Sequence, residues 1–186
     1  MSESIKYDPG QITFSKLTEA DLPLLHRWLN TTHVSQWWGV DGKRNPDYED
    51  VINKFIPRIQ GRDQVNCYLV QYDTRPVAFI ESCLIDNFPT GKEALRIPAN
   101  AAGVDTFIGE NDFLHKGFGA VYIRKFLKEI VFLQPEITSC IIDPEPVNKI
   151  AIRAYEKAGF NYSHMAWNAK DSADAYIMTI RRESVC

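Results

Sequence analysis

Apolar residues change their spacing repeatedly along the chain, and each change of period predicts a new element. Alternating or short apolar runs predict strands, while apolar residues three and four positions apart predict helices. The predicted strands span residues 11–17, 64–72, 76–85, 103–109, 137–143, 161–167 and 174–180. The predicted helices lie within residues 18–29, 46–56, 113–132 and 146–160, and loops are expected at 30–45 and 86–101.

The order of these elements predicts an α/β (α+β) fold. The short turn at residues 73–75 predicts a hairpin, and the strand–helix–strand segment from Gly103 to Asp143 predicts a parallel crossover inside a mixed sheet. Pro57 is expected to end or kink the second helix. The 186 residues are expected to form a single domain, with residues 1–10 as a flexible N-terminal tail.

Composition and charge exclude several classes of protein. No apolar run approaches the ~20 residues of a membrane span, and the opening MSESIKYDPG lacks the apolar core of a secretion signal. The net charge of −3 provides no basic face for nucleic acid, and the four histidines show no metal-ligand spacing. Scattered cysteines without a CxxC pair favour free thiols and a cytoplasmic location: Cys67, Cys83, Cys140 and Cys186.

The negative charge is unevenly distributed. Between Glu81 and Asp112 there are six acidic and two basic residues, so this segment carries −4 and the rest of the chain +1. Such a segment is either an ordinary solvated face or a site for a cationic partner.

Gly117 and Gly119 open a predicted helix, where each glycine costs ~1 kcal/mol relative to alanine. A helix N-terminus presents unpaired N–H groups and partial positive charge, and a glycine lets an anion approach them without a Cβ in the way. The pattern therefore indicates a phosphate or pyrophosphate site, with a tight packed turn as the alternative. The segment has neither the GxxxxGK[ST] motif nor the third glycine of the dinucleotide fingerprint.

The last 80 or so residues favour the anion site. A strand, a KGFG helix, a strand and then NKIAIRAYEKAGF follow one another, and this arrangement resembles the GNAT superfamily of acyl-CoA-dependent N-acetyltransferases. The resemblance implies a GNAT fold, whose mixed central sheet has splayed middle strands with acetyl-CoA between them and no metal. It places the pyrophosphate on the backbone amides of His115, Lys116, Gly117, Phe118, Gly119 and Ala120. Leu114 stands where many members carry Arg or Gln, so one side-chain contribution to this loop is missing.

Within this superfamily the chain resembles the aminoglycoside 6′-N-acetyltransferases over nearly its full length. The likeness rests on LTEADLPLLHRWLN, HVSQWWG, PVAFIES, GVDTFIGENDFLHKGFG and TSCIIDPEPVNKIAIRAYEKAGF. It implies a cationic small-molecule amine as substrate, bound by two acids and paired tryptophans: Asp105, Asp143, Trp37 and Trp38. Residues 90–97 differ, because relatives can carry several carboxylates there and this chain carries only Glu93.

Acetyl transfer from a thioester to an amine needs a neutral amine, close approach, a site for the oxyanion and a proton for the leaving thiolate. A backbone N–H near Phe107 and Ile108 can stabilise the oxyanion, so both residues are expected to contact acetyl-CoA. A phenol with an ordinary pKa of ~10 can return a proton to a thiolate of pKa ~8.5. The resemblance places Tyr155 for this role, and packing in the core is the alternative.

The other candidate residues each allow two interpretations. Asp105 lies on a strand predicted to be buried, where a carboxylate needs a partner. It is either a catalytic residue, which anchors the attacking ammonium and accepts its proton through water, or a carboxylate satisfied by backbone amides. Asp143 is a second candidate anchor. Trp37 and Trp38 either pack in the core or stack on the substrate. Asn148 either caps its helix or contacts the pantetheine arm, the latter implied by the resemblance.

Three functions remain open at this point. The preferred one is an acetyl-CoA-dependent N-acetyltransferase for a primary amine of a cationic molecule, foremost the 6′-amine of an aminoglycoside antibiotic, which would confer resistance. The alternatives are a siderophore-type hydroxylysine N-acyltransferase and a non-catalytic acyl-CoA-binding module. Asp105 and Tyr155 favour an enzyme. The protein is expected to be a monomer or dimer without nucleic-acid or membrane partners.

Overall fold

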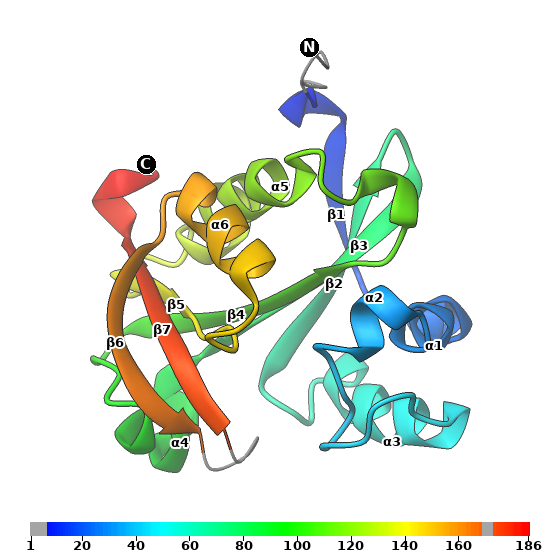
Figure 1. Cartoon of the computed structure of the whole chain (residues 1–186), viewed down its shortest axis with the longest axis horizontal. Helices are drawn as coiled ribbons and strands as arrows, with labels where there is room; N and C mark the ends of the chain where they lie inside the picture. The colour runs from blue at the N-terminus through cyan, green and yellow to red at the C-terminus, as the bar shows by residue number, and fades with distance from the viewer. Residues whose placement is uncertain (1–6, 169–172) are drawn as a thin grey trace.

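A computed structural model describes residues 7–168 and 173–186 (Figure 1). Its strands form one seven-stranded sheet in the order β1-β2-β3-β4-β5-β7-β6. The strands are β1 (Ile12–Lys16), β2 (Val65–Tyr72), β3 (Arg75–Leu84), β4 (Ala101–Ile108), β5 (Ser139–Ile142), β6 (Asn161–Asn168) and β7 (Ala173–Arg181). The helices are α1 (Leu22–Leu29), α2 (Thr32–Ser35), α3 (Tyr48–Ile59), α4 (Pro89–Ala94), α5 (Phe118–Phe126), which continues as a π-helical turn (Leu127–Val131), and α6 (Lys149–Ala158).

The sheet parts between its two central strands. β4 and β5 are parallel, and the other neighbouring strands are antiparallel. β4 pairs with β3 as far as Ile108, but it pairs with β5 only from Ala101 to Gly103. One edge of β4 is therefore open beyond Gly103, and in Figure 1 β4 runs away from β5 and β7. This confirms the predicted mixed sheet with flanking helices and supplies its splayed middle strands.

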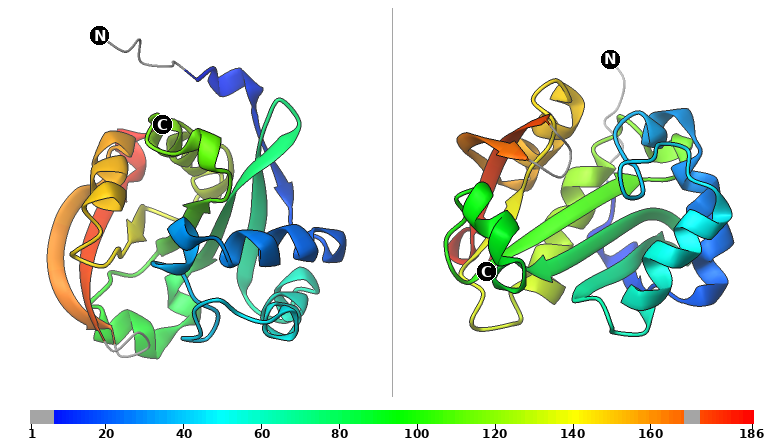
Figure 2. Two further views of the ribbon diagram at one scale, coloured as in Figure 1. Left: turned by 45° about the vertical axis from the view of Figure 1, so that its right-hand side comes forward. Right: turned by 90° about the horizontal axis from the view of Figure 1, so that it is seen from below.

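Helices cover both faces of this sheet. α1 and α3 pack on one face, where Trp28 and Phe55 join the core cluster of Phe79. α5 and α6 pack on the other face, in the cluster that contains Ala78 and Ile80. Side chains alternate along β3, which sends Phe79 to one face and its neighbours to the other. Both views of Figure 2 place α1–α3 and the β6–β7 pair at opposite ends of the molecule.

Several predicted elements are confirmed. β2 and β3 form the expected hairpin, and its turn residues Asp73 and Thr74 have φ of 48° and 69°, as a two-residue hairpin turn requires. The segment β4–α5–β5 is the predicted parallel crossover.

Other details of the prediction are wrong. The predicted loops 30–45 and 86–101 contain the short helices α2 and α4, and β4 begins at Ala101 instead of Gly103. Helices of four and six residues are too short to show a readable period, which explains both missed helices. Pro57 neither ends nor breaks α3, which continues to Ile59. Only two helical residues follow Pro57, and its carbonyl accepts hydrogen bonds from the Arg62 and Asp63 N–H groups beyond the end of the helix.

The expected tail at residues 1–10 is only partly covered by the structure. Residues 1–6 lie outside the described residues. In the remainder, Tyr7 packs against Tyr72 and Phe118, with ring centroids 5.4 and 4.8 Å apart. Pro9–Gln11 forms a 3-10 turn capped by Asp8. Tyr7 is therefore part of the packed fold, because its ring adds to an aromatic cluster beside α5, whereas Asp8, Pro9 and Gly10 are exposed.

Candidate active site

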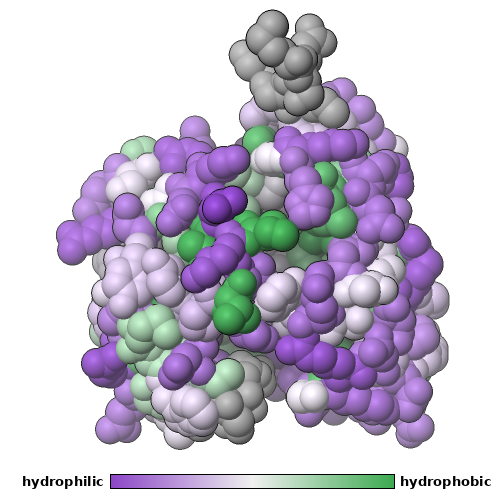
Figure 3. Space-filling view, viewed as in Figure 1, coloured by the Kyte–Doolittle hydropathy of each residue, from purple (hydrophilic) through white to green (hydrophobic). Residues whose placement is uncertain are grey.

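An open cavity of about 1010 Å³, which we call the central cleft, lies where β4 and β5 part. Its wall combines residues 37–42 and Arg44, α3, β3 and β4 with α4 and the segment after β5. Figure 3 shows the surface hollowed between the two halves of the molecule, with apolar side chains near the centre of this face. Six predicted site residues meet on this wall: Trp37, Trp38, Asp105, Asp143, Asn148 and Tyr155.

Tyr155 reaches the central cleft from the opposite face of the sheet. It belongs to α6 and to the core cluster on the α5–α6 face, and it is 8% exposed. The cleft residues Glu81 and Cys83 lie on β3, and Cys83 packs against the cluster on the α3 face. The gap between β4 and β5 explains how one side chain serves both faces. A molecule bound on the α5–α6 face and another in the cleft can meet at Tyr155.

The Tyr155 hydroxyl is available to a ligand. No buried side-chain oxygen in the described part of the chain lacks a hydrogen-bond partner, and the structure gives this hydroxyl none, so it opens into the cleft. Burial raises the pKa of Tyr155, and the nearby Tyr122, Asp105 and Asp143 raise it further. The phenol therefore keeps its proton at neutral and mildly alkaline pH, as a proton donor requires.

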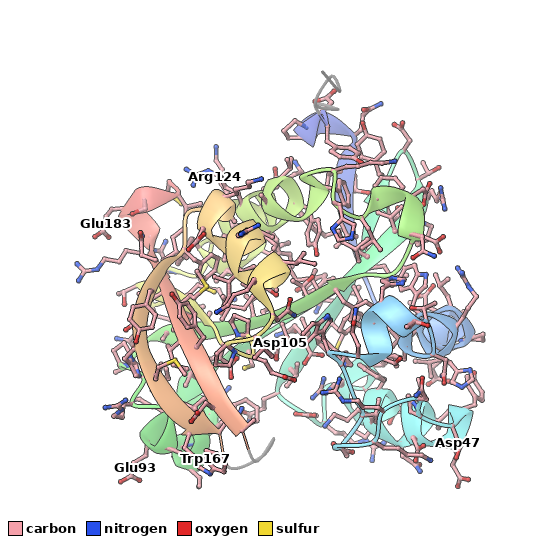
Figure 4. All side chains as sticks on the ribbon, in the orientation of Figure 1. Asp47, Glu93, Asp105, Arg124, Trp167 and Glu183 are labelled. Carbon is pink, nitrogen blue, oxygen red and sulfur yellow. The ribbon has the colours of Figure 1, made fainter. Side chains whose placement is uncertain are left out.

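Asp105 is exposed to the central cleft, which corrects its predicted burial on a strand. The reason is that β4 has already lost its β5 neighbour at this position. Figure 4 shows Asp105 near the centre of the molecule, between the two halves. Its neighbour across the β3–β4 ladder is Glu81, so two carboxylates lie side by side on one face of the sheet.

The charge of Glu81 is compensated within the protein. Glu81 is 7% exposed, and its Oε2 accepts a hydrogen bond from Arg58 Nη1 at 2.5 Å. Arg58 Nε also donates to Asp63 Oδ2 at 3.0 Å, which fixes the guanidinium in place. Because Arg58 offsets Glu81, Asp105 does not face an uncompensated like charge.

The paired tryptophans differ in environment: Trp38 packs in the core, and Trp37 is exposed to the cleft. The Trp38 ring meets Phe79 and Phe107 edge-on, at centroid distances of 5.8 and 5.0 Å, so it packs in the core as well as lining the cleft. Trp37 is 38% exposed and also lines the cleft. Trp37 is therefore the one positioned to stack on a ligand.

The segment after β5 carries Asp143 and Asn148 to the cleft. Asp143 follows β5 directly, is half-buried, and accepts a hydrogen bond from Asn168 Nδ2 at 3.4 Å. Asn148 Oδ1 accepts a hydrogen bond from the Ala151 N–H at 3.1 Å, which confirms its role as the cap of α6. It also lines the cleft, so the cap leaves part of Asn148 accessible to a ligand.

The loop before α5 presents backbone N–H groups that are not tied to other parts of the described fold. Among the turn, loop and cap hydrogen bonds of the described residues, none is donated by the backbone of residues 115–120. Gly117 has φ of +82°, so its conformation alone favours glycine. Gly119 has no such requirement, and a Cβ there would lie 3.9 Å from its nearest neighbour, Ala154. Packing does not explain Gly119, which favours close approach of an anion over a packed turn.

The side chains of residues 115–118 do not form an anion site of their own. Phe118 is fully buried and packs against Phe113 and Tyr122. Lys116 Nζ donates to the Asp112 carbonyl at 2.6 Å, and His115 is exposed. A phosphate at this loop would therefore be held by the backbone, as the pattern of glycines predicts.

The end of β4 is held rigidly beside Phe107 and Ile108. His33 Nε2 lies 3.0 Å from the Ile108 carbonyl oxygen. At the next residue, a Cβ on Gly109 would fall 2.1 Å from the Trp28 ring, so only glycine fits against it. The open edge of β4 is thus fixed from the α1–α2 side. Neither Phe107 nor Ile108 lines the central cleft, so the structure does not group them with the other candidates.

Seven further charged residues line the cleft that the sequence does not single out as site residues: Asp41, Arg44, Lys54, Arg58, Glu81, Lys92 and Glu145. The segment Glu81–Asp112 is not one negative face. Glu110 and Asp112 bind Arg75, and Asp86 binds Lys92. Glu81 and Asp105 alone among its six acids line the cleft. Glu93 is exposed on α4 and points away from the centre in Figure 4.

The described residues contain neither a metal-ligand cluster nor a helix that could span a membrane. No group of three or more His, Cys, Asp or Glu side chains among them is arranged to hold a metal ion. None of the helices at residues 7–168 and 173–186 is long and apolar enough to cross a membrane.

A helix N-terminus on one face of the sheet and an open cleft on the other, joined at one tyrosine, suit an enzyme that transfers a group between two molecules. The family described as "Acetyltransferase (GNAT) domain" matches residues 18–166. The chain belongs to this family, which confirms the resemblance found in the sequence. It is an acetyl-CoA-dependent N-acetyltransferase.

The chain is similar to characterised members of this family. It is 33% identical over 149 residues to the aminoglycoside N(6′)-acetyltransferases type 1 of Klebsiella pneumoniae and Serratia marcescens, covering 80% of this chain and 73% of each relative. The structure of AAC(6′)-Ib in complex with ribostamycin and coenzyme A superposes with a TM-score of 0.83 at 29% identity, covering 94% of this chain and 95% of the other.

Proposed function

We propose that this chain transfers the acetyl group of acetyl-CoA to the 6′-amine of an aminoglycoside, and so confers resistance to such antibiotics. The observation that carries the proposal is the passage at Tyr155, which joins the face with the amides of residues 115–120 to a cleft lined by carboxylates and Trp37. The relatives that act on aminoglycosides support the substrate class. A cytoplasmic location, suited to four free cysteines, belongs to the same proposal.

The residues of this chain fit acetyl-CoA on the α5–α6 face. The backbone N–H groups of residues 115–120 have no partner among the loop, turn and cap hydrogen bonds, and the space at Gly117 and Gly119 is open. They would hold the pyrophosphate, and Asn148 would meet the pantetheine arm. The bound coenzyme supplies the acetyl thioester, whose carbonyl oxygen we assign to a backbone N–H at the open edge of β4, near Ile108.

The acceptor occupies the central cleft. Asp105 and Asp143 bind its ammonium groups, and Trp37 stacks on a ring of the acceptor. The neutral amine attacks the thioester carbon, the carbon–sulfur bond breaks, and Tyr155 gives its proton to the departing sulfur. The nitrogen loses one proton as the amide forms, and this proton passes through water to the Tyr155 phenolate, which restores the phenol. Positioning of the two reactants supplies the largest share of the acceleration.

A thiol-release assay with acetyl-CoA tests this function across kanamycin, spermidine, lysine derivatives and hydroxylysine-like amines. Mass spectrometry of the kanamycin product should show a single acetyl group on the 6′-amine. Efficient acetylation of hydroxylysine-like amines without turnover of any aminoglycoside would instead identify a siderophore-type acyltransferase. Coenzyme binding without turnover of any amine would identify a non-catalytic acyl-CoA-binding module.

Gly119→Ala separates packing from coenzyme binding at the glycine loop. The unliganded variant should melt at the same temperature or higher, because alanine favours a helix by ~1 kcal/mol over glycine and a Cβ at this position would have 3.9 Å of space. The rise in melting temperature with acetyl-CoA should shrink, because the methyl group stands between the amides and the pyrophosphate. Differential scanning fluorimetry measures both values. An undiminished shift would show that the pyrophosphate binds elsewhere.

A further inference from the structure

An ion pair spans the central cleft from one half of the molecule to the other. Arg44 Nη2 lies 3.2 Å from Glu145 Oε1, and both residues line the cleft. Arg44 precedes α3, and Glu145 follows β5, so the pair joins segments on either side of the gap between β4 and β5. By contrast, the cleft pairs Lys54–Asp41 and Arg58–Glu81 each lie within the N-terminal half.

The Arg44 end of the bridge stands on a rigid loop. Val40 is buried, and its backbone exchanges two hydrogen bonds of 2.9 Å with Lys43. The Lys43 ammonium binds Asp47 and Asp50 at 2.7 and 2.6 Å, and none of these three residues lines the cleft. Arg44 itself is oriented by a 3.0 Å hydrogen bond from Nη1 to the Ser35 carbonyl.

The Glu145 end is equally fixed in its backbone. Glu145 stands between Pro144 and Pro146, whose rings restrict the chain. Its carbonyl accepts a hydrogen bond from the Asn148 N–H at 2.9 Å. The two side chains are 45% and 38% exposed, so each can leave the other while both loops stay in place.

We propose that Glu145 forms a cation subsite of the acceptor cleft, and that Arg44 fills this subsite until an ammonium group of the acceptor displaces it. The inference rests on the proposed function, since it needs a cationic acceptor. Breaking an exposed ion pair of this kind corresponds to about 1.5- to 5-fold in an equilibrium constant. An acceptor with several ammonium groups recovers this cost, because one of them pairs with Glu145. An acceptor with a single amine places that amine at the reaction centre and has no second ammonium group for Glu145. Arg44 is thereby a specificity-determining residue that favours polycationic acceptors.

The exchange predicts opposite effects for the two partners of one ion pair. Glu145→Gln should raise KM for kanamycin about threefold or more, because it removes the anion that binds the substrate. Arg44→Gln should lower KM for kanamycin by up to about fivefold, because it removes the internal competitor. In the Glu145→Gln background, Arg44→Gln should change KM by less than about twofold, since the competition no longer exists. In all three variants kcat should change little.

Lys43→Gln is the matched control, because it removes the same charge from the adjacent residue, which does not line the cleft. It should leave KM for kanamycin nearly unchanged. If the bridge only holds the cleft in shape, Arg44→Gln and Glu145→Gln will raise KM alike, and that result would overturn the inference. Equal KM values in both variants and the wild type would overturn it too.

Calorimetric titration with kanamycin keeps this test independent of turnover. The dissociation constants should follow the same order, with Arg44→Gln binding more tightly and Glu145→Gln more weakly than the wild type. Failure of the wild type to acetylate any aminoglycoside would reject the proposed function, while the order of the binding constants still decides the exchange. Turnover of kanamycin together with weaker binding by Arg44→Gln would reject the exchange and leave the proposed function standing.

Discussion

Tyr155→Phe is expected to lower kcat by ~10²–10⁴-fold, the usual contribution of a general acid. The change removes a hydroxyl that opens into the cleft without a protein partner, while the ring keeps its place in the core. Acetyl-CoA affinity should therefore stay close to that of the wild type. Steady-state kinetics with kanamycin and a direct measurement of coenzyme binding check the two halves of this expectation.

The pH dependence of the wild type follows from the direction of the pKa shift. Burial and the neighbouring carboxylates raise the pKa of Tyr155 above its ordinary value of ~10. The phenol therefore remains protonated from pH 6 to 9, and kcat should show no alkaline decline from Tyr155 in this range. If Tyr155→Phe retains turnover within twofold across pH 6–9, Tyr155 is a packing residue and another group supplies the proton.

Tyr122→Phe is the matched control for Tyr155→Phe. The Tyr122 hydroxyl is buried and lies 2.7 Å from Thr106 Oγ1, so its removal should cost about 0.5–1.5 kcal/mol of folding stability. Tyr122 does not line the cleft, so the kcat of Tyr122→Phe should fall far less than that of Tyr155→Phe. Thermal melts and kinetics on the two variants then separate loss of a structural hydroxyl from loss of a proton donor.

The sequence alone predicts the main helices and strands and the candidate residues at their ends. Periodicity locates the strands and the long helices, because α1, α3, α5 and α6 each bury one face over at least two turns. The family resemblance indicates Asp143 at the end of β5, and the glycine spacing indicates the N-terminus of α5. The place of Asn148 before α6 predicts a cap, and its hydrogen bond to Ala151 confirms this.

The ion-pair partners of the charged residues cannot be predicted from the sequence. The apolar strand around Asp105 predicts burial, but the loss of β5 as a neighbour beyond Gly103 exposes the carboxylate, and no local pattern encodes that event. Arg58 and Glu81 are 23 residues apart in the chain, and Arg44 and Glu145 are 101 apart. Pairings at such distances follow from tertiary packing. A signal is present in Glu81 itself, an acid inside the apolar run PVAFIESCLI, and in Glu145 between two prolines.

Asp105→Asn is expected to lower kcat/KM for kanamycin by at least tenfold. Asp105 lies at the centre of the cleft and within electrostatic reach of Tyr155, whose pKa it helps to raise. Removing one partner of a close ion pair at a binding site can cost ~2–5 kcal/mol, and an exposed ion pair costs less. We therefore set the expected loss in kcat/KM at no less than tenfold. Asn keeps the shape of the side chain, which confines the change to its charge.

The dependence on salt distinguishes a direct contact from a diffuse field. Added salt should weaken kcat/KM of the wild type, and Asp105→Asn should show a smaller slope because one of the interacting charges is gone. Asp112→Asn is the matched control, since Asp112 belongs to the same acidic segment but binds Arg75 away from the cleft. It should change kcat/KM by less than twofold. Equal losses in both variants would mean that the segment attracts the substrate as a whole and that Asp105 makes no specific contact with it.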